Sequence, residues 1–349
     1  MTRFSAKPLL ALFLAAAILA FACSRPGGED QGIHQVTVKL PWVKNPEFAF
    51  VDLGVEKGFF RSRGIDLAVE NSRGSHQVVA AFDTKSINFG FLSGDSLVIA
   101  RQKGVPVQAL FVLFPSSPAV IVSLKDSNIR KPKDLLGKSV GIITSSTTFP
   151  QFRAMLKNAW KPEPPPEPGE DYYEIEAVSG GLAQLQAGQI DALTHYENFA
   201  PIQLEVAGYE IAPLIYMRDY EIDIYSTVFA TTDEFIRTKP ELVQNIVNAM
   251  LDSLELAVKD PEAALAALNE QNEDVSAMGE PEYLEKALAV ALGLANSRAS
   301  EGIALGFMDK HGWYRTERTL QKTGQAGDIS EDYYFDDRFF SEYHRKNGS

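Results

Sequence analysis

The stretch HQVTVKLPWVKNPEFAFVDLGVEKGFFRSRGIDLAVEN, residues 34–71, predicts a strand, a helix and a second strand in succession. Residues 34–42 and 64–71 carry the alternating or apolar patterns of strands, whereas 45–60 has apolar residues at helical spacing. Asn45 is a favourable N-cap for that helix, and it is followed by a proline suited to the first turn. Strands and helices continue to alternate further along the chain, which indicates an α/β arrangement with parallel strands.

A second α/β unit follows the first, and then the pattern changes. After residue 226 long amphipathic helices dominate, with little strand between them. We therefore expect two α/β lobes joined by two chain crossings around a cleft, with a helical C-terminal tail packed on the first lobe. The expected boundaries are 34–126 and 226–349 for the first lobe and 127–225 for the second.

The N-terminus has the features of a secretory signal. Arg3 and Lys7 precede an apolar run of about 14 residues, which is too short to span a bilayer comfortably. The run ends at Cys23, the one cysteine of the chain, and this segment resembles a bacterial lipobox. We expect a signal peptide at 1–22, a lipid anchor on Cys23 and a polar tether at 23–33. A plain secretory signal with an incidental cysteine is the alternative.

The overall charge argues against a nucleic-acid partner. The formal net charge is −13, and no strongly basic run occurs, whereas phosphate binding needs clustered Lys and Arg. The chain has five histidines without the spacing of metal ligands. No Ser–His–Asp arrangement is evident either. We expect neither a metal nor a cofactor.

In α/β lobes ligands bind at the carboxyl ends of strands, where loops lead into helices. Trp42 directly follows the first predicted strand and could stack on a planar ring or cover the core. Asn45 is a candidate ligand contact and, equally, a helix cap. In the stretch SGD, Ser93 is a candidate contact, whereas Asp95 is expected to cap a helix.

Two further junctions in the second unit are polar. The first is TSSTTF, where a helix start combines hydroxyl groups with free N–H groups that suit an anion or a carbonyl oxygen. Ligand contact and simple capping are both open for these candidates, Ser145, Ser146, Thr147 and Thr148.

The second polar junction is DALTHYENFAP, residues 191–201. Tyr196 can stack or donate a hydrogen bond and Glu197 can accept one, so both are candidate ligand contacts. His195 is expected on the opposite face. Near the second crossing, Tyr225 and Ser226 either line the cleft or form the hinge.

An ordered series of segments resembles the thiamine-precursor and sulfonate type of periplasmic binding protein. The resemblance covers roughly residues 34–345 and rests on the segments LPWVKNPEFAFVDLGVEKGFFRSRGIDLAVE, SINFGFLSGDSLVIARQKGVPV, IRKPKDLLGKSVGI, AGQIDALTHYENFAPIQLEVAG and DEFIRTKPELVQNIVNAMLDSLELAVKDPEAA. It implies a type II periplasmic binding-protein fold. It also favours ligand contact by Trp42, because pyrimidine binders of this type use an aromatic residue there.

The same family has an enzymatic branch that makes the thiamine pyrimidine with a pyridoxal-phosphate lysine, a histidine and a cysteine-rich run. The lysine position falls on Leu92 and the histidine position on Ser96 in this chain. The cysteine-rich position falls near IYSTVFATT, which contains no cysteine. The enzyme is therefore the disfavoured alternative.

The expected function is that of a lipid-anchored, extracytoplasmic binding protein that delivers a solute to the permease and ATPase of an ABC importer. A planar heterocycle, such as a thiamine-pyrimidine precursor or riboflavin, is the expected ligand, because aromatic residues and a carboxylate occupy the predicted cleft. A sulfonate or another oxoanion is the runner-up, since it would use the hydroxyl-rich helix start. A sensor that signals through a membrane partner is a third possibility.

Overall fold

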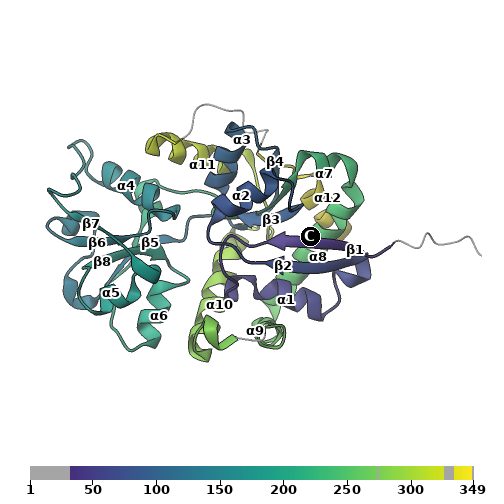
Figure 1. The fold of residues 1–349 in the computed structure, drawn as a ribbon, viewed down its shortest axis with the longest axis horizontal. Helices are drawn as coiled ribbons and strands as arrows, with labels where there is room; N and C mark the ends of the chain where they lie inside the picture. Colours follow the sequence, from purple (N-terminus) through teal and green to yellow (C-terminus); the bar gives the residue numbers. More distant parts are fainter. Residues whose placement is uncertain (1–31, 273–274, 326–333, 348–349) are drawn as a thin grey trace, which may run out of the picture.

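The computed structural model describes residues 32–272, 275–325 and 334–347 (Figure 1). The predicted signal peptide, the lipidated Cys23 and the tether up to residue 31 lie outside the described residues. Within the described part of the chain, no helix combines the length and the apolar character that a bilayer span needs.

Two five-stranded sheets form the centres of two lobes, which lie side by side in Figure 1. The first sheet has the order β2-β1-β3-β10-β4. Its strands are β1 (His34–Lys39), β2 (Ile65–Glu70), β3 (Phe89–Leu92), β4 (Val107–Phe114) and β10 (Thr227–Thr232). Strand β1 pairs in parallel with β2 and β3, whereas β10 runs antiparallel between β3 and β4. The predicted parallel arrangement thus has one strand of opposite direction.

The second sheet repeats this plan with the order β7-β6-β8-β5-β9. Its strands are β5 (Ala119–Ser123), β6 (Ser139–Ile142), β7 (Tyr173–Glu176), β8 (Ala192–Tyr196) and β9 (Ile215–Tyr216). Strand β6 pairs in parallel with β7 and β8, and β5 runs antiparallel to β8 and β9. In both lobes the parallel strands therefore end at one edge, where their loops can form a common site.

Strand β5 corrects the predicted lobe boundary. The sequence places residues up to 126 in the first lobe, but Ala119–Ser123 pairs with β8 of the second sheet. The first crossing therefore lies between Phe114, which ends β4, and Ala119. The run AVIVS is apolar on both faces and buried throughout, so its pattern is the same in either sheet and cannot reveal which one it joins.

The helix after β1 starts as the sequence predicts. It begins as a single 3-10 turn, η1 (Pro46–Phe48), and continues as α1 (Ala49–Glu56). The Asn45 side-chain oxygen accepts a hydrogen bond from the backbone N–H of Glu47 at 2.9 Å, which confirms Asn45 as the cap. This cap directs the chain from the end of β1 into the helix within a few residues.

The tail packs on the first lobe, as predicted. Helix α8 (Pro240–Lys259) packs against α1, and α12 (Arg338–Asn347) packs against α8. Helix α9 (Pro261–Glu270) also covers α1. Four other helices of the two lobes are α2 (Ser75–Asp83), α3 (Gly94–Gln102), α5 (Leu182–Gln186) and α7 (Asp233–Thr238).

Two tail helices also reach the second lobe. Helix α10 (Pro281–Ala295) contacts α6 (Ala200–Val206), and α11 (Lys310–Thr323) contacts α4 (Thr148–Ala159). The α10–α6 contact is an apolar cluster that contains Ile202. The tail therefore does more than cover the first lobe, because it joins the two lobes outside the chain crossings.

The two chain crossings are tied together by Asp223. Its Oδ1 accepts hydrogen bonds from Ser116 Oγ at 2.6 Å and from the Ser117 backbone N–H at 2.9 Å. Its Oδ2 pairs with Arg315 of α11, and Arg315 also donates to the carbonyl of Pro115 at 3.2 Å. One carboxylate thus connects both crossings and the tail.

We expect Asp223→Ala to lower the free energy of unfolding by about 1–3 kcal/mol, because it leaves a backbone N–H and a guanidinium without their acceptor. Urea unfolding followed by circular dichroism measures this. Glu234→Ala is the matched control, since it breaks the exposed pair with Lys85, which is worth about 0–1 kcal/mol. Equal losses in the two variants would contradict the role given to Asp223.

Candidate functional site

A cavity of about 1130 Å³ lies between the lobes. It is lined by the loops that follow β1, β3, β6 and β8 and by the start of β10. Its volume is close to the upper end of the roughly 300–1,000 Å³ that small-molecule sites span. The lining combines aromatic side chains with many polar ones, which can fix the orientation of a bound molecule.

The structure brings most of the predicted contact residues to this cavity. The residues that line it are Trp42, Asn45, Ser93, Ser145, Ser146, Thr147, Thr148 and Tyr196. Ser226 lines it too, whereas Tyr225 is fully buried and donates its backbone N–H to Thr316 Oγ1 of α11. Of the two residues at the second crossing, Ser226 therefore lines the cleft and Tyr225 packs in the core of the first lobe. A hinge role for Tyr225 stays a prediction. Contact of the lining residues with a ligand stays a prediction.

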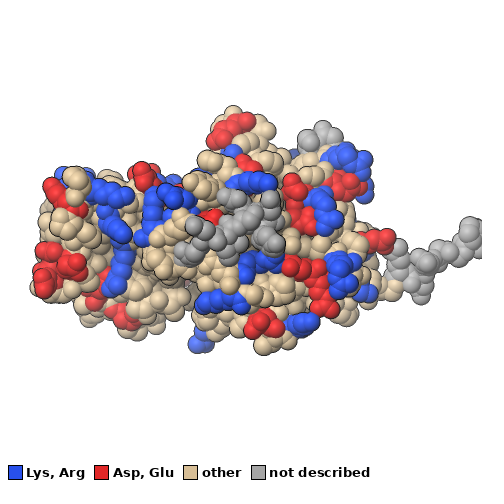
Figure 2. Space-filling model, turned by 90° about the horizontal axis from the view of Figure 1, so that it is seen from above, with Lys and Arg blue, Asp and Glu red and all other residues tan. Residues whose placement is uncertain are grey.

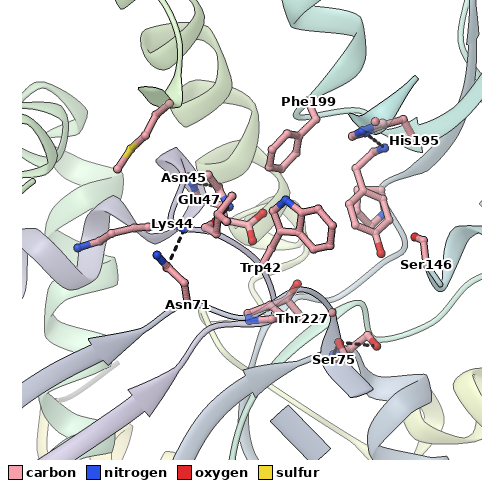
Figure 3. Close-up of a pocket in the computed structure, with 18 of the residues that line it drawn as sticks. Trp42, Lys44, Asn45, Glu47, Asn71, Ser75, Ser146, His195, Phe199 and Thr227 are labelled. Carbon is pink, nitrogen blue, oxygen red and sulfur yellow. Dashed lines mark hydrogen bonds between the residues drawn. The ribbon is translucent and has the colours of Figure 1, made fainter. Parts of the chain in front are cut away.

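Trp42 is the largest flat surface in the cavity. This residue is 42% exposed and lies three residues beyond the end of β1. Figure 3 shows the indole projecting into the cavity, with the ring of Phe199 reaching toward the same space from the second lobe. Two aromatic side chains from opposite lobes can hold a planar ring by stacking or edge contacts.

Glu197 does not lie where the sequence predicts. It is absent from the described residues that line the cavity. Its Oε1 instead accepts a hydrogen bond from Arg218 Nη1 at 2.7 Å, and Arg218 also donates to the carbonyl of Ser117 at 2.9 Å. The backbone N–H of Glu197 bonds to the carbonyl of Pro118 and extends the β5–β8 ladder by one residue. Because side chains alternate along such a ladder, Tyr196 and Glu197 face opposite ways.

His195 also differs from expectation, because it lines the cavity. Its ring lies 5.7 Å from that of Phe199 between centroids. Burial lowers the pKa of His195 to about 4, so the imidazole is neutral at physiological pH. Nδ1 accepts a hydrogen bond from the backbone N–H of Tyr196 at 2.9 Å. The proton of the ring is therefore assigned to Nε2, which makes the imidazole a donor on its other side.

Glu47 is a cavity residue that the sequence prediction missed. It lies in the first helical turn after the capping Asn45, where the helix dipole favours an acidic residue. An acidic residue at this position is therefore common in helices and does not by itself indicate a binding site. Asn198 Nδ2, from the second lobe, donates to Glu47 Oε2 at 3.0 Å. Burial raises the pKa of the Glu47 carboxyl group to about 7, although the hydrogen bonds of Asn198 and Asn45 act to lower it.

The hydroxyl groups at the start of α4 are engaged with one another. Ser146 Oγ accepts hydrogen bonds from the backbone N–H of Thr148 at 3.2 Å and from Thr148 Oγ1 at 3.0 Å. Thr147 Oγ1 and Tyr196 Oη lie 2.8 Å apart. These bonds hold the Tyr196 ring against the helix start, so capping and cavity lining occur together here.

Ser93, the predicted contact in the first lobe, directly follows β3. Ser93 Oγ bonds to Ser96 Oγ at 2.9 Å, and Asp95 Oδ1 accepts the backbone N–H of Ser96 at 2.7 Å. The predicted cap by Asp95 is wrong, because Asp95 is the second residue of α3 and Ser93 holds the N-cap position without a side-chain capping hydrogen bond. Burial raises the pKa of Asp95.

Positive charge is sparse in the cavity. Lys44 is the one Lys or Arg among the described lining residues, and its ammonium group pairs with Asp52. Arg153 of α4, the arginine close to the hydroxyl-rich helix start, forms a two-point ion pair with Glu174, at 3.0 and 2.6 Å. Across the face shown in Figure 2, basic and acidic side chains are interspersed. In the described ranges no cluster of His, Cys, Asp and Glu is suited to hold a metal ion.

Residues 45–264 match the family described as NMT1/THI5 like. The chain is 24% identical to riboflavin-binding protein RibY of Chloroflexus aurantiacus over 84% of this chain and 82% of that protein. It is 22% identical to the formylaminopyrimidine-binding protein of Halalkalibacterium halodurans over 87% and 94%. A shorter match, 29% identical over 31% and 34%, is to the 4-amino-5-hydroxymethyl-2-methylpyrimidine phosphate synthase of Legionella pneumophila.

Among solved structures, the periplasmic aliphatic sulphonate binding protein SsuA of Escherichia coli superposes with a TM-score of 0.61. The match covers 83% of this chain and 85% of that protein at 14% identity. It confirms the predicted two-lobe fold.

We expect Trp42 to account for most of the fluorescence that acrylamide can quench. The chain has three tryptophans, and the other two, Trp160 and Trp313, are 8% and 0% exposed. Trp42→Phe should therefore remove most of the accessible emission and leave a signal that resists quenching. Trp160→Phe is the matched control and should leave the quenchable fraction in place. Unchanged quenching in Trp42→Phe would contradict the exposure of this indole in the cavity.

Proposed function

The chain belongs to the NMT1/THI5-like family, and we propose that it is an extracytoplasmic solute-binding protein that captures a small planar heterocycle between its two lobes. The observation that carries this proposal is the exposed indole of Trp42 inside a cavity built by both lobes. A ring stacked on Trp42 would meet Phe199 from the other lobe and Glu47 at its edge. Hinged closure around such a ligand needs no chemical step.

Two relatives support this ligand class by name. The riboflavin-binding protein and the formylaminopyrimidine-binding protein are both aligned over more than four fifths of this chain. Riboflavin and formylaminopyrimidine are flat, nitrogen-containing rings. The cavity volume of about 1130 Å³ accommodates either a single ring or a larger ring system.

An oxoanion such as a sulfonate is the second candidate. The hydroxyl groups and backbone N–H groups at the start of α4 favour it. A sulfonate would also gain from an unpaired cation, but Lys44 is paired with Asp52 and Arg153 with Glu174. The cavity therefore supports the heterocycle better.

An enzyme of pyrimidine synthesis has less support. The position that corresponds to the catalytic lysine of that branch is Leu92, which is fully buried in the first lobe. The position that corresponds to its histidine is Ser96, whose hydroxyl group bonds to Ser93. Neither residue can form an aldimine or transfer a proton as the family's enzymes require. We therefore propose binding without turnover and without a cofactor.

The partners and location follow from this proposal. A binding protein of this kind delivers its solute to the permease and ATPase of an ABC importer on the outer face of the cytoplasmic membrane. Lipid on Cys23, followed by the tether, would keep the protein at that membrane. A sensor function would use the same cleft with a different membrane partner.

Isothermal titration with riboflavin, a formylaminopyrimidine and an aliphatic sulfonate tests the ligand class. We expect saturable binding of at least one heterocycle and none of the sulfonate at the same concentration. Binding of the sulfonate alone would overturn the proposal in favour of the second candidate. Release of product from a bound heterocycle would overturn it in favour of an enzyme.

We expect Trp42→Ala to weaken heterocycle binding by about 1–3 kcal/mol, the range found for stacking of a base on an aromatic side chain. The titration that identifies the ligand measures this loss. Glu197→Ala is the matched control, because its carboxylate pairs with Arg218 outside the cavity. Full affinity in Trp42→Ala, or an equal loss in both variants, would contradict the site.

A further inference from the structure

We propose that Glu47 selects ligands whose planar ring presents an N–H or amine donor at its edge, and that binding of such a ligand is coupled to the protonation of this carboxyl group. The inference rests on the proposed function, since it concerns the same cavity. It goes further by naming the chemical feature of the ring that the site recognises and the residue that recognises it.

Glu47 lies where three parts of the chain meet. It belongs to η1 of the first lobe, and tail helix α10 packs against η1. From the second lobe, Asn198 Nδ2 donates to Glu47 Oε2 at 3.0 Å. Asn198 is itself 2% exposed, so this hydrogen bond is formed deep in the seam between the lobes. This hydrogen bond can form only when both lobes are in place.

The carboxyl group is also directed toward the ligand space. Glu47 lines the cavity, and Figure 3 shows its carboxylate pointing toward the indole of Trp42. A ring that lies on Trp42 would therefore place one edge against Glu47. An ionised carboxylate has about four acceptor positions, and Asn198 and Asn45 do not use them all. A donor on the ring edge can occupy a remaining one.

No cation neutralises this carboxylate among the described residues. The nearest ammonium group on the same loop, that of Lys44, pairs with Asp52. The titratable groups that face Glu47 from other elements are Tyr196 of β8 and Tyr283 of α10, and burial, with a smaller contribution from the charge of Glu47, raises the pKa of both. His195 of β8 is neutral. An ionised Glu47 is therefore half-buried without a countercharge, and a donor from the ligand would stabilise it.

The direction of the proton coupling follows from the burial. An exposed glutamate has a pKa of about 4.3, whereas burial raises that of Glu47 to about 7. At and below pH 7 the carboxyl group is thus protonated to a substantial degree. A ring N–H forms a stronger hydrogen bond with the ionised carboxylate than with the neutral carboxyl group, so binding lowers the pKa and releases a proton. Affinity should be full above about pH 8 and should fall as the pH is lowered through 7.

The experiment measures the binding of matched pairs of small molecules to the full chain. One pair is riboflavin and 3-methylriboflavin, and the other is 4-amino-2-methylpyrimidine and its 4-dimethylamino derivative. In each pair the second compound keeps the ring and loses the donor. The wild-type protein should bind the donor-bearing member of at least one pair about tenfold or more tightly, as for a hydrogen bond to a charged group.

Glu47→Gln should remove most of this preference and flatten the decline of affinity between about pH 8 and pH 6. Glu197→Gln is the matched control and should keep both, because its carboxylate faces Arg218. Thermal unfolding verifies that each variant is folded. Should Glu47→Gln fail to fold, Glu47→Asp is used, and its shortened carboxylate should reduce the preference while the pH dependence persists.

The outcomes are distinct. A donor preference that survives in Glu47→Gln overturns the inference and leaves the proposed function intact. A wild-type pH profile that matches that of Glu47→Gln also overturns it. A wild-type protein that binds none of the four probes overturns the proposed function, and the inference with it.

Discussion

The carboxylate of Asp223 ties together the two chain segments that connect the lobes around the shared cavity. Each sheet offers its ligand-facing loops only at the edge where its parallel strands end. A site built from both sheets therefore requires these two edges to face one another. Asp223 contacts the first crossing through Ser116 and Ser117 and the tail through Arg315. It thereby holds the two connecting segments and the tail together.

The tail contributes to the same seam. Helix α10 belongs to the first lobe, but its residues Tyr283, Leu284 and Ala287 form a buried cluster with Ile202 of α6 in the second lobe. Each square ångström of apolar surface buried in this way contributes about 25 cal/mol. Bringing the lobes together therefore buries protein surface as well as ligand. This gives the helical tail a part in positioning the cavity that packing on the first lobe alone would not require.

Two glutamates near the seam show how environment decides the role of a side chain. Arg218 donates a hydrogen bond to Glu197 and balances its negative charge outside the cavity. Glu47 is half-buried with amide donors but no cation among the described residues, and desolvation raises its pKa. A carboxylate without a countercharge gains most from a donor that arrives with the ligand. Residue type does not distinguish the two, whereas their neighbours do.

Much of the fold and part of the site could be predicted from local patterns. The period of two in β1 and the cap at Asn45 are properties of a few consecutive residues, so the sequence determined this strand, the start of the helix and the position of Trp42 between them. The strand period also implies that Tyr196 and Glu197 face opposite ways, a signal that was available and that the predicted site did not use.

Other features were decided by contacts between residues far apart in the chain. The sheet that β5 joins depends on its pairing with β8, because a run that is apolar on both faces fits either lobe. The cavity position of Glu47 depends on Asn198, which lies 151 residues away. Local periodicity determines the elements and the relative direction of neighbouring side chains. Only the packing of the two lobes decides which side chains line the cavity, because the opposite wall is formed by residues that are distant in the chain.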